Sequence, residues 1–232
     1  MKRVGIIGAM ELEVEELKSK MKITRKLEKA SMEFLEGMLN GTDVVIVRSG
    51  VGKVNAALCA QILCDIFEVS HIINTGVAGS LRNEINIGDI VVSTDALYHD
   101  VDARVFGYRL GEVPQMGCLA FEADEKLSGL AVECCQKVNQ DISVYSGRIV
   151  SGDQFISDKQ VKENIISNFN GFCVEMEGAA IAHAAYRNQV PFVIIRAISD
   201  KADDSAEMDY PTFEKAAAAH SAALVEHMLP LI

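Results

Sequence analysis

The chain has 232 residues, and its 33 acidic and 22 basic side chains give a formal net charge of −11 at pH 7. A hydrophobic content of 49% is typical of a globular protein and excludes an intrinsically disordered one; the length suits one large α/β domain or two small ones. The negative charge disfavours binding to a nucleic-acid backbone or an anionic membrane, but it does not exclude a small neutral ligand in a pocket.

The N-terminal segment and the cysteines indicate where the protein works. Residues 4–10 form a short apolar run, but the acidic segment that follows contains no small-residue cleavage region, so we expect no signal peptide. No apolar stretch approaches the ~20 residues that a membrane span needs. The six cysteines include no C-x-x-C pair and lie mostly in apolar segments, so we expect reduced thiols. These features predict a cytoplasmic protein with no nucleic-acid or membrane partner.

The first fifty residues predict a strand, a helix and a β-hairpin. Residues 2–10 read as a buried strand that ends at glycine, and the apolar spacing in 11–20 predicts a helix. Two strand-like runs within 32–50 flank Asn40-Gly41, a dipeptide that tolerates the positive φ angles of a tight turn. We therefore expect a hairpin there.

A helix, two strands and a long loop are expected up to residue 120. Residues 52–67 have the amphipathic spacing of a helix, and 69–80 predict a strand that leads into a glycine loop. Further strand is expected over 88–100. Residues 100–120 contain three glycines and a proline, which favours a long irregular loop.

The next segment again alternates helix and strand. Helices are expected near 124–139 and 159–169, and strands over 143–153 and 171–175. The chain contains no low-complexity linker and no internal repeat, so we expect a single domain over residues 1–232.

The C-terminal segment completes an α/β pattern. An alanine-rich helix is expected over 175–188, an almost continuous apolar strand over 191–200, and a last helix over 212–229. Strands that alternate with helices predict a sheet covered on both faces, and the hairpin means that this sheet is not purely parallel.

Three glycine-containing segments, Gly8-Ala9, Gly50–Gly52 and Gly76–Gly79, follow predicted strands. Neither a P-loop nor a dinucleotide-binding G-x-G-x-x-G pattern is present. Each segment alone is explained by an ordinary turn. Because ligands collect at the carboxyl ends of strands in open α/β sheets, the three together favour a shared pocket.

Carboxylates stand at the same strand ends. Glu13 lies in the first turn after the first strand, and Glu175 and Glu177 flank a strand-to-helix junction. Simple matching to a helix dipole is an alternative explanation for each of them. We expect only one of the pair at 175 and 177 to face a pocket, because side chains diverge once a helix begins. Asp200 ends the most apolar strand, four residues after Arg196, and is the carboxylate least easily explained as a helix cap.

The remaining polar residues favour chemistry without a metal or a nucleophilic side chain. The five histidines do not converge in a metal-binding pattern, so we expect no metal and no cofactor. Ser151 with Asp153, and Ser199 with Asp200, lack the G-x-S-x-G elbow and an obvious partner histidine. Acids, bases and a positioned water therefore fit best.

Seven segments in order carry a family resemblance: GIIGAMELEV, SGVGKVNAA, INTGVAGS, YHDVDARVFGY, VSGDQFI, VEMEGAAIAH and VIIRAISDKAD. Together they resemble the 5'-methylthioadenosine/S-adenosylhomocysteine nucleosidases of the nucleoside phosphorylase superfamily over essentially the whole chain. The resemblance implies a three-layer α/β/α sandwich with a central mixed β-sheet or barrel. It also implies a homodimer that hydrolyses adenine N-glycosidic bonds without a metal or cofactor, in methionine salvage and the recycling of S-adenosylmethionine by-products.

The resemblance also implies roles for individual residues. Asp200 corresponds to the general acid that protonates adenine N7, Glu13 to the glutamate that activates water, and Glu177 to the ligand of the ribose hydroxyls. Ser199 would support Asp200, and Arg196 would order the pocket carboxylates. Further substrate contacts are implied for Met10, Val51, Val77, Phe155, the backbone of Ile156, Glu175, Met176 and Tyr210. Within the loop 100–110, the residues implied to reach the partner subunit's pocket are Ala103, Phe106 and Tyr108.

A few residues depart from the family pattern, and two alternative functions remain. Leu12 interrupts an acidic run, Val77 replaces a serine of some members, and Tyr210 replaces a phenylalanine, which bears on substrate preference. A purine nucleoside phosphorylase would need cations for phosphate, for which Arg48 is available, whereas Glu13 would repel phosphate. A nucleoside-binding protein without catalysis is the other alternative, and the presence of all three acidic residues argues against it.

Overall fold

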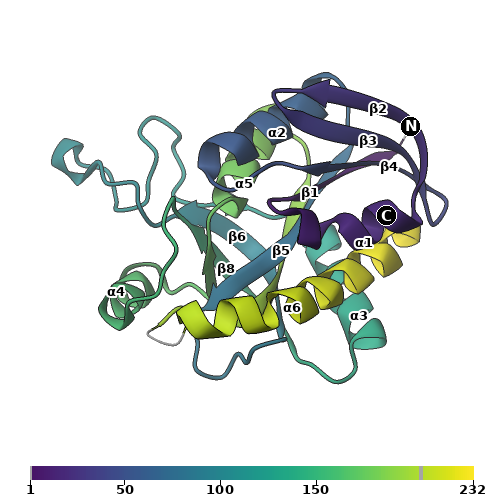
Figure 1. Ribbon diagram of the computed structural model, residues 1–232. Helices are drawn as coiled ribbons and strands as arrows, with labels where there is room; N and C mark the ends of the chain where they lie inside the picture. Colours follow the sequence, from purple (N-terminus) through teal and green to yellow (C-terminus); the bar gives the residue numbers. More distant parts are fainter. Residues whose placement is uncertain (1, 204–205) are drawn as a thin grey trace.

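A mixed β-sheet whose central strands are buried on both faces organises the computed structural model, which describes residues 2–203 and 206–232 (Figure 1). At its centre β5 (His71–Ser80) runs parallel to β10 (Phe192–Asp200). Every residue of β10 is buried. A strand covered on both faces needs apolar side chains on both, which explains its almost continuous run of valine and isoleucine.

Part of the sheet closes on itself. In addition to β5 and β10 the closed part contains β6 (Ile90–Tyr98), β8 (Val144–Ser151) and β9 (Cys173–Glu175). β10 pairs with β6, β6 with β8, β8 with β9, and β9 returns to β5. The β10–β6 and β9–β5 pairs are antiparallel and the others are parallel. The predicted mixed sheet with a barrel is therefore confirmed.

An open extension continues from β5 on the other side. Its strands follow in the order β1 (Arg3–Gly8), β4 (Thr42–Arg48), β3 (Met32–Leu39) and β2 (Lys22–Lys29). The predicted hairpin is confirmed, since β3 and β4 are antiparallel and Asn40 and Gly41 have φ angles of 49° and 79° between them. A short strand, β7 (Phe121–Glu122), pairs with β6.

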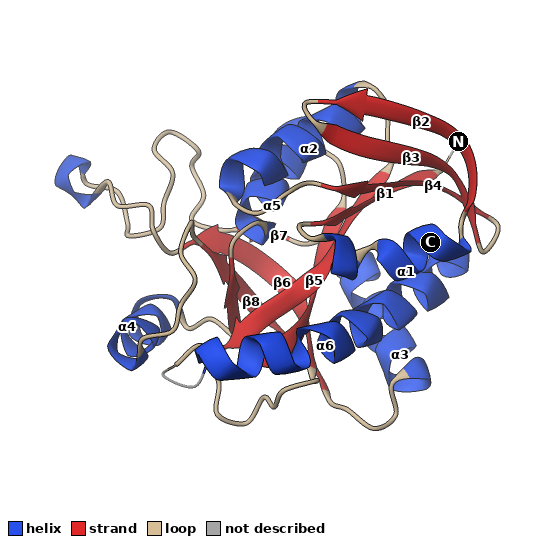
Figure 2. Ribbon diagram, viewed as in Figure 1, coloured by secondary structure: helices blue, strands red, loops and turns tan. Residues whose placement is uncertain are grey.

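Helices cover both faces of the sheet and complete the layers (Figure 2). One face is covered by α2 (Lys53–Asp65) and α5 (Gly178–Asn188). The other is covered by α1 (Glu15–Lys20), α3 (Glu125–Val138) and α6 (Ala206–Met228). α4 (Lys159–Phe169) packs at one end of the barrel. The 3-10 turns are η1 (Glu11–Glu13), η2 (Arg104–Phe106) and η3 (Leu229–Leu231).

Alternate residues of the central strands supply two separate cores. In β10, Ile194 and Ile198 pack with residues of α2 and α5, whereas Val193 and Ile195 pack with residues of α3 and α6. This alternation is the period-2 geometry of a strand, here with both faces apolar. Within the described ranges, no helix is long and apolar enough to cross a membrane.

The structure differs from the sequence-based expectations at β2, α6 and β5. β2 was not predicted, because nearly all of its side chains are exposed and no apolar alternation marks it. α6 begins at Ala206 rather than at 212, so Pro211 lies inside the helix instead of before it. β5 does not end in a glycine loop but continues through Gly76 and Gly79 to Ser80. The irregular segment 100–120 is confirmed, and η2 lies at the tip of its projection (Figure 1).

Candidate active site

A cavity of about 480 Å³, including its open mouth, lies where β1, β4, β9 and β10 end. The three predicted glycine-containing segments all contribute to its wall, through Ala9, Val51 and the stretch 77–79. The expectation of a shared pocket at the strand ends is thus confirmed.

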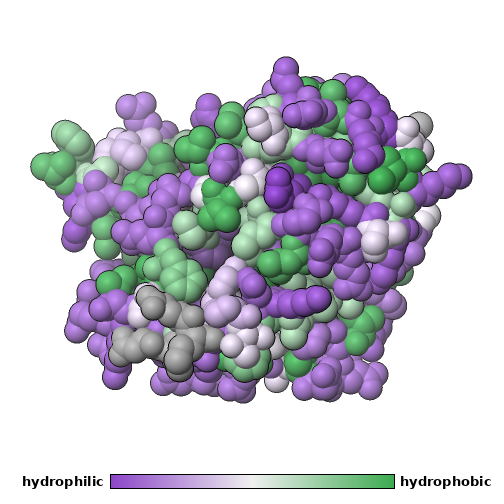
Figure 3. All heavy atoms as spheres, viewed as in Figure 1, coloured by the Kyte–Doolittle hydropathy of each residue, from purple (hydrophilic) through white to green (hydrophobic). Residues whose placement is uncertain are grey.

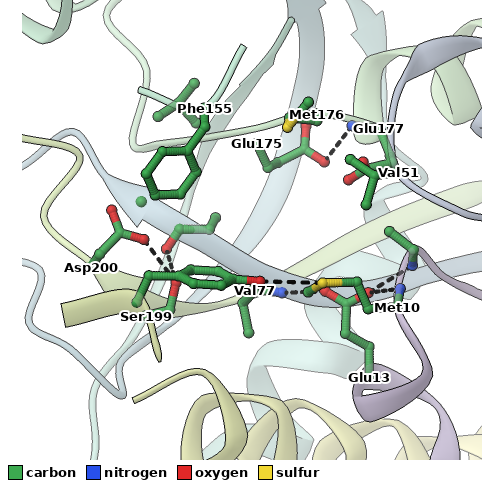
Figure 4. Close-up of a pocket in the computed structure, with 15 residues that line it drawn as sticks. Met10, Glu13, Val51, Val77, Phe155, Glu175, Met176, Glu177, Ser199 and Asp200 are labelled. Atoms are coloured by element: carbon green, nitrogen blue, oxygen red, sulfur yellow. Dashed lines mark hydrogen bonds between the residues drawn. The ribbon is translucent and has the colours of Figure 1, made fainter. Parts of the chain in front are cut away.

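Most of the residues singled out in the sequence line this cavity (Figure 4). They are Met10, Glu13, Val51, Val77, Phe155, Glu175, Met176, Glu177, Ser199, Asp200 and Tyr210. Ile156 is instead buried in the core with Leu81 and Leu97. Arg196 lies behind the wall. The structure places Ala103, Phe106 and Tyr108 in the projecting loop, away from this chain's own cavity.

Arg196 is the buried cation of the site, with 1% of its surface exposed. Its Nη2 donates hydrogen bonds to the Glu175 carboxylate and, at 2.6 Å, to Asn74 Oδ1. The same nitrogen lies 3.8 Å from Glu177 Oε2. The attraction of Glu175, Glu13 and Glu177 outweighs the effect of burial and raises the pKa of Arg196. The arginine that interrupts an apolar strand therefore compensates the negative charge of the carboxyl groups at the cavity.

Gly76 allows Arg196 and Glu13 to lie next to β5. It pairs with Arg196 across the β5–β10 ladder. A Cβ atom at this position would lie 2.5 Å from both Arg196 Nη1 and Glu13 Oε1. This glycine is therefore required by close approach of charged groups, and it does not mark a turn.

Glu13 is held by backbone donors. Its Oε2 accepts hydrogen bonds from the N–H groups of Ala9 (2.6 Å) and Met10 (2.9 Å), and its Oε1 accepts one from Val77 (3.0 Å). Burial raises the pKa of the carboxyl, although Arg196 and these three N–H groups oppose the effect. The carboxylate is therefore fixed in orientation, on the side of the cavity away from Asp200 (Figure 4).

The pair of glutamates at the β9–α5 junction differs from the expectation. Both Glu175 and Glu177 line the cavity, so the expectation that only one would face it was wrong. Glu177 is the N-cap of α5 and precedes the helical turns, so its side chain stays on the same side as that of Glu175. Glu175 accepts hydrogen bonds from Ser151 and from the N–H groups of Glu177 and Gly178, in addition to Arg196.

Glu177 keeps more of its hydrogen-bonding capacity. It accepts a hydrogen bond from the Gly52 N–H at 2.8 Å, and its other oxygen faces Arg196 at the longer distance given above. Burial, followed by repulsion from Glu175, raises the pKa of Glu177 to about 8, against the opposing effect of Arg196. Three carboxyl groups thus share one guanidinium. The end of the cavity that contains Glu177 therefore favours ligand groups that carry a positive charge or donate hydroxyl hydrogen bonds.

Asp200 stands at the opposite end of the cavity, beside Phe155 (Figure 4). Its Oδ2 accepts a hydrogen bond from Ser199 Oγ at 2.9 Å, and its Oδ1 accepts one from the Ala202 N–H at 2.8 Å. Burial raises the pKa of Asp200, and the nearby Asp209 and Asp203 add to that increase. A carboxyl group with a raised pKa can hold a proton for transfer nearer to neutral pH.

Aromatic rings flank this acid. The ring of Phe155 meets that of Tyr210 edge-on, with centroids 5.7 Å apart, and half of the Phe155 surface is exposed. The Tyr210 hydroxyl points at Met10 Sδ, 3.2 Å away. A flat, uncharged ring bound next to Phe155 would bring its polar edge to Asp200.

Three residues hold the site together in roles that were not predicted from the sequence. Asn74 and Ser151 bind Arg196 and Glu175, and Ser151 Oγ also accepts the Ala179 N–H at 2.7 Å. Gly52 donates to Glu177. All three lie in segments singled out by resemblance, but their local sequence indicates only strand or turn. In residues 2–203 and 206–232, no cluster of three or more His, Cys, Asp or Glu side chains could hold a metal ion.

Comparison with known families agrees with this geometry. The family model described as the phosphorylase superfamily matches residues 3–230. A 5'-methylthioadenosine/S-adenosylhomocysteine nucleosidase of Halalkalibacterium halodurans is 44% identical over 226 residues, which cover 97% of this chain and 96% of that protein.

Solved structures show the same similarity. The chain has a TM-score of 0.95 and 41% identity to the nucleosidase of Colwellia psychrerythraea in complex with adenine, with 99% and 95% of the two chains covered. Its TM-score to the corresponding protein of Neisseria meningitidis, bound to methylthio-immucillin-A, is 0.96 at 38% identity, and both chains are covered completely.

The charge balance around Glu177 predicts how stability depends on pH. A carboxyl group whose pKa rises from 4.5 to about 8 on folding binds its proton more tightly in the folded state. Stability from this group is therefore present below the unfolded pKa and is lost as pH rises toward the folded one. We expect Glu177→Gln to flatten the fall in the free energy of unfolding between pH 5.5 and 7.5, by up to ~1.4 kcal/mol per pH unit.

Urea unfolding at several pH values measures this dependence. The matched control is Glu163→Gln, which neutralises an exposed carboxylate on α4 and should leave the wild-type slope unchanged. Equal slopes for wild type and Glu177→Gln would contradict the raised pKa.

Proposed function

The chain belongs to the 5'-methylthioadenosine/S-adenosylhomocysteine nucleosidase family of the phosphorylase superfamily, and we propose that it hydrolyses the N-glycosidic bond of these two nucleosides. The products are adenine and the corresponding 5-thioribose. The observation that carries the proposal is the division of the cavity: a buried acid beside an aromatic ring at one end, and a surplus of carboxyl groups over guanidinium at the other. Complexes of two similar proteins with adenine and with methylthio-immucillin-A support it.

Asp200 acts on the departing base in this proposal. When the bond between C1' and N9 breaks, its electron pair goes to adenine, and the proton of Asp200 moves to N7. General acid catalysis of this kind typically contributes about 10²–10⁴-fold. Support comes from the raised pKa of Asp200 and from its two donors, Ser199 and the Ala202 N–H, which stabilise the carboxylate that remains.

Glu13 and Glu177 act on the sugar. As the base leaves, positive charge develops on the ribose ring, and carboxyl groups already held in place beside the ring stabilise it. Glu177 accepts hydrogen bonds from the ribose hydroxyls. Glu13 accepts a proton from water as the water oxygen forms its bond to C1'. The three backbone donors on Glu13 support this role, because they fix the direction in which its free lone pairs point.

The remaining cavity residues bind the neutral parts of the substrate. Phe155 offers a face for adenine, and the backbone of Ile156 is proposed to bind the edge of that base. The walls of the ribose and thioalkyl regions are Met10, Val51, Val77, Met176 and Tyr210.

Phosphorolysis is the weaker alternative on two grounds. The guanidinium of Arg196 already binds Glu175 and Asn74. Arg48 does not line the cavity and faces Glu11 at 3.9 Å. Among the described residues of the cavity wall there is therefore no unpaired cation that could bind a phosphate ion. Glu13 would also repel phosphate. A binding protein without catalysis is disfavoured because Glu13, Glu177 and Asp200 converge on one cavity.

Adenine release with and without phosphate tests the reaction. We expect methylthioadenosine to yield adenine at the same rate in both buffers, with no ribose 1-phosphate. Asp200→Asn should retain substrate binding while kcat falls by about 10²–10⁴-fold, since the asparagine cannot donate the proton. Formation of adenine only in the presence of phosphate would show a phosphorylase instead, and near-normal turnover by Asp200→Asn would exclude its role as the acid.

We also propose a homodimer in which the loop 100–110 reaches the partner's cavity. Val105 and Phe106, at the tip of this loop, are 86% and 78% exposed, and Val54 and Leu58 on α2 are 71% and 48% exposed. Figure 3 shows hydrophobic side chains at the loop tip and over α2. Large exposed apolar side chains in neighbouring regions are typical of protein–protein contacts. Ala103, Phe106 and Tyr108 would then complete the thioalkyl region of the partner's site.

Mixing two impaired variants tests the exchange of loops. Phe106→Ala and Asp200→Asn should each have low activity alone. A mixed dimer contains one intact site, formed by the body of the Phe106→Ala subunit and the loop of the other. We therefore expect activity to recover on mixing under conditions of subunit exchange. A fully active monomer in sedimentation, or no recovery in verified mixed dimers, would contradict this arrangement.

The proposed setting is the cytoplasm, in methionine salvage and the recycling of S-adenosylmethionine by-products. If the protein acts in methionine salvage, deletion of its gene should abolish growth on methylthioadenosine as the sole sulfur source. Unchanged growth and unchanged methylthioadenosine levels would contradict it.

A further inference from the structure

Lys162 is a buried lysine outside the cavity. It lies on α4 with 6% of its surface exposed. It is not among the described residues that line the cavity. A lysine is rarely buried to this extent without partners, because removing its charge from water is costly. Its surroundings therefore indicate what the charge does.

The ammonium group of Lys162 binds the segment that follows Asp200. Its Nζ donates a hydrogen bond to the Lys201 carbonyl oxygen at 2.6 Å and lies 3.5 Å from Asp203 Oδ2. The Lys201 carbonyl and the Ala202 N–H belong to the same peptide group. That N–H is the donor to Asp200 Oδ1 at 2.8 Å. One peptide group thus links the ammonium of Lys162 to the carboxyl of Asp200.

We propose that Lys162 is a positioning residue for the acid Asp200, acting through the peptide group between Lys201 and Ala202. This inference rests on the proposed function, because it assigns Lys162 a part in the proton transfer from Asp200. Lys162 does not touch the substrate.

Two physical effects act through this peptide. The peptide group is planar, so fixing its carbonyl oxygen also fixes the direction of its N–H. A cation at the carbonyl polarises the group and strengthens the hydrogen bond that its N–H donates. The carboxylate form of Asp200, which appears as the proton leaves, is the form that gains from this stronger donor.

The turn is held from its other side by Gly79. A Cβ atom on Gly79 would lie 2.7 Å from Asp200 Oδ1 and 2.8 Å from the Ala202 Cβ. Ala202 itself has a φ of 51°, in the left-handed region that non-glycine residues rarely adopt. The turn is thus confined between β5 and Lys162, which explains how a strained conformation persists next to the acid.

Other charged groups near Asp200 act in the opposite sense. Asp203 and Asp209 favour its protonated form. Lys201 directs its own Nζ to the carbonyl oxygens of Ile85 (2.5 Å) and Asn83 (3.2 Å). Lys162 faces the peptide from α4 with the opposite charge, and its Nζ also lies near Asp203.

Three substitutions separate charge from hydrogen bonding. Lys162→Arg keeps both, Lys162→Gln keeps a donor without the charge, and Lys162→Met removes both. The control is Lys159→Met, which removes an exposed charge from the same helix. Thermal unfolding of each variant reports any loss of stability, so that activity is compared among folded proteins.

The readout is the pH profile of kcat and KM with methylthioadenosine. For Lys162→Met we expect kcat to fall about tenfold and KM to change by less than about twofold. A tenfold loss is a fraction of the contribution of a general acid, which is typically about 10²–10⁴-fold. The basic limb of the profile should move to higher pH, since the carboxylate is less stabilised. Lys162→Gln should be intermediate, and Lys162→Arg and Lys159→Met close to wild type.

Combination with Asp200→Asn decides whether Lys162 acts through Asp200. We expect Lys162→Met to cause no further loss of the residual activity in that background. An equal fold-loss in both backgrounds, or folded Lys162→Met with a wild-type profile, would overturn the proposal. Failure of the wild-type protein to release adenine would instead overturn the proposed function, so the two failures are distinguishable.

Discussion

The buried ionic contact of Arg196 with Glu175 and Glu177, to which the nearby carboxyl group of Glu13 adds its attraction, is the interaction on which the site depends. Burying a charge is costly unless the charge is paired and hydrogen-bonded. Glu175 meets this requirement with donors from Ser151 and from the start of α5, in addition to Arg196. Its role is therefore to hold Arg196 and the first turn of α5 together, and so to fix Glu177.

This ionic contact dictates features that lie far apart in the sequence. β5 carries glycine at position 76 because a side chain would collide with Arg196 and Glu13. The loop before α2 approaches closely enough for Gly52 to bind Glu177. One guanidinium does not balance three carboxyl groups, so the site favours ligands that bring positive charge or hydroxyl donors. Asp200 lies outside this contact, so the pKa of the proposed acid is set by other neighbours.

Local patterns in the sequence predicted the elements but not the contacts between them. The hairpin at Asn40-Gly41 and the apolar strand ending in Asp200 carry clear local signals, and both are confirmed. The glycines of β5 carry the local signal of a turn. Glycine is required at position 76, however, because of the side chain of Arg196 on the neighbouring strand, 120 residues away in the chain. β2 carries no apolar alternation, and Pro211 hides the true start of α6. Family resemblance identified the cavity residues; Lys162 has no sequence signal, because its partner is a backbone carbonyl.

We propose that the surplus of carboxyl groups around Arg196 stabilises a cationic sugar. Calorimetric titration at pH 7, in buffers of different ionisation enthalpy, tests it with two analogues. One is a pyrrolidinium analogue of the nucleoside with its ammonium fully protonated, and the other is its neutral carbocyclic counterpart. Since the pKa of Glu177 is about 8, the account predicts that the cation binds more tightly and releases a proton, and that Glu177→Gln loses most of this release. Equal affinities with no proton exchange would contradict it.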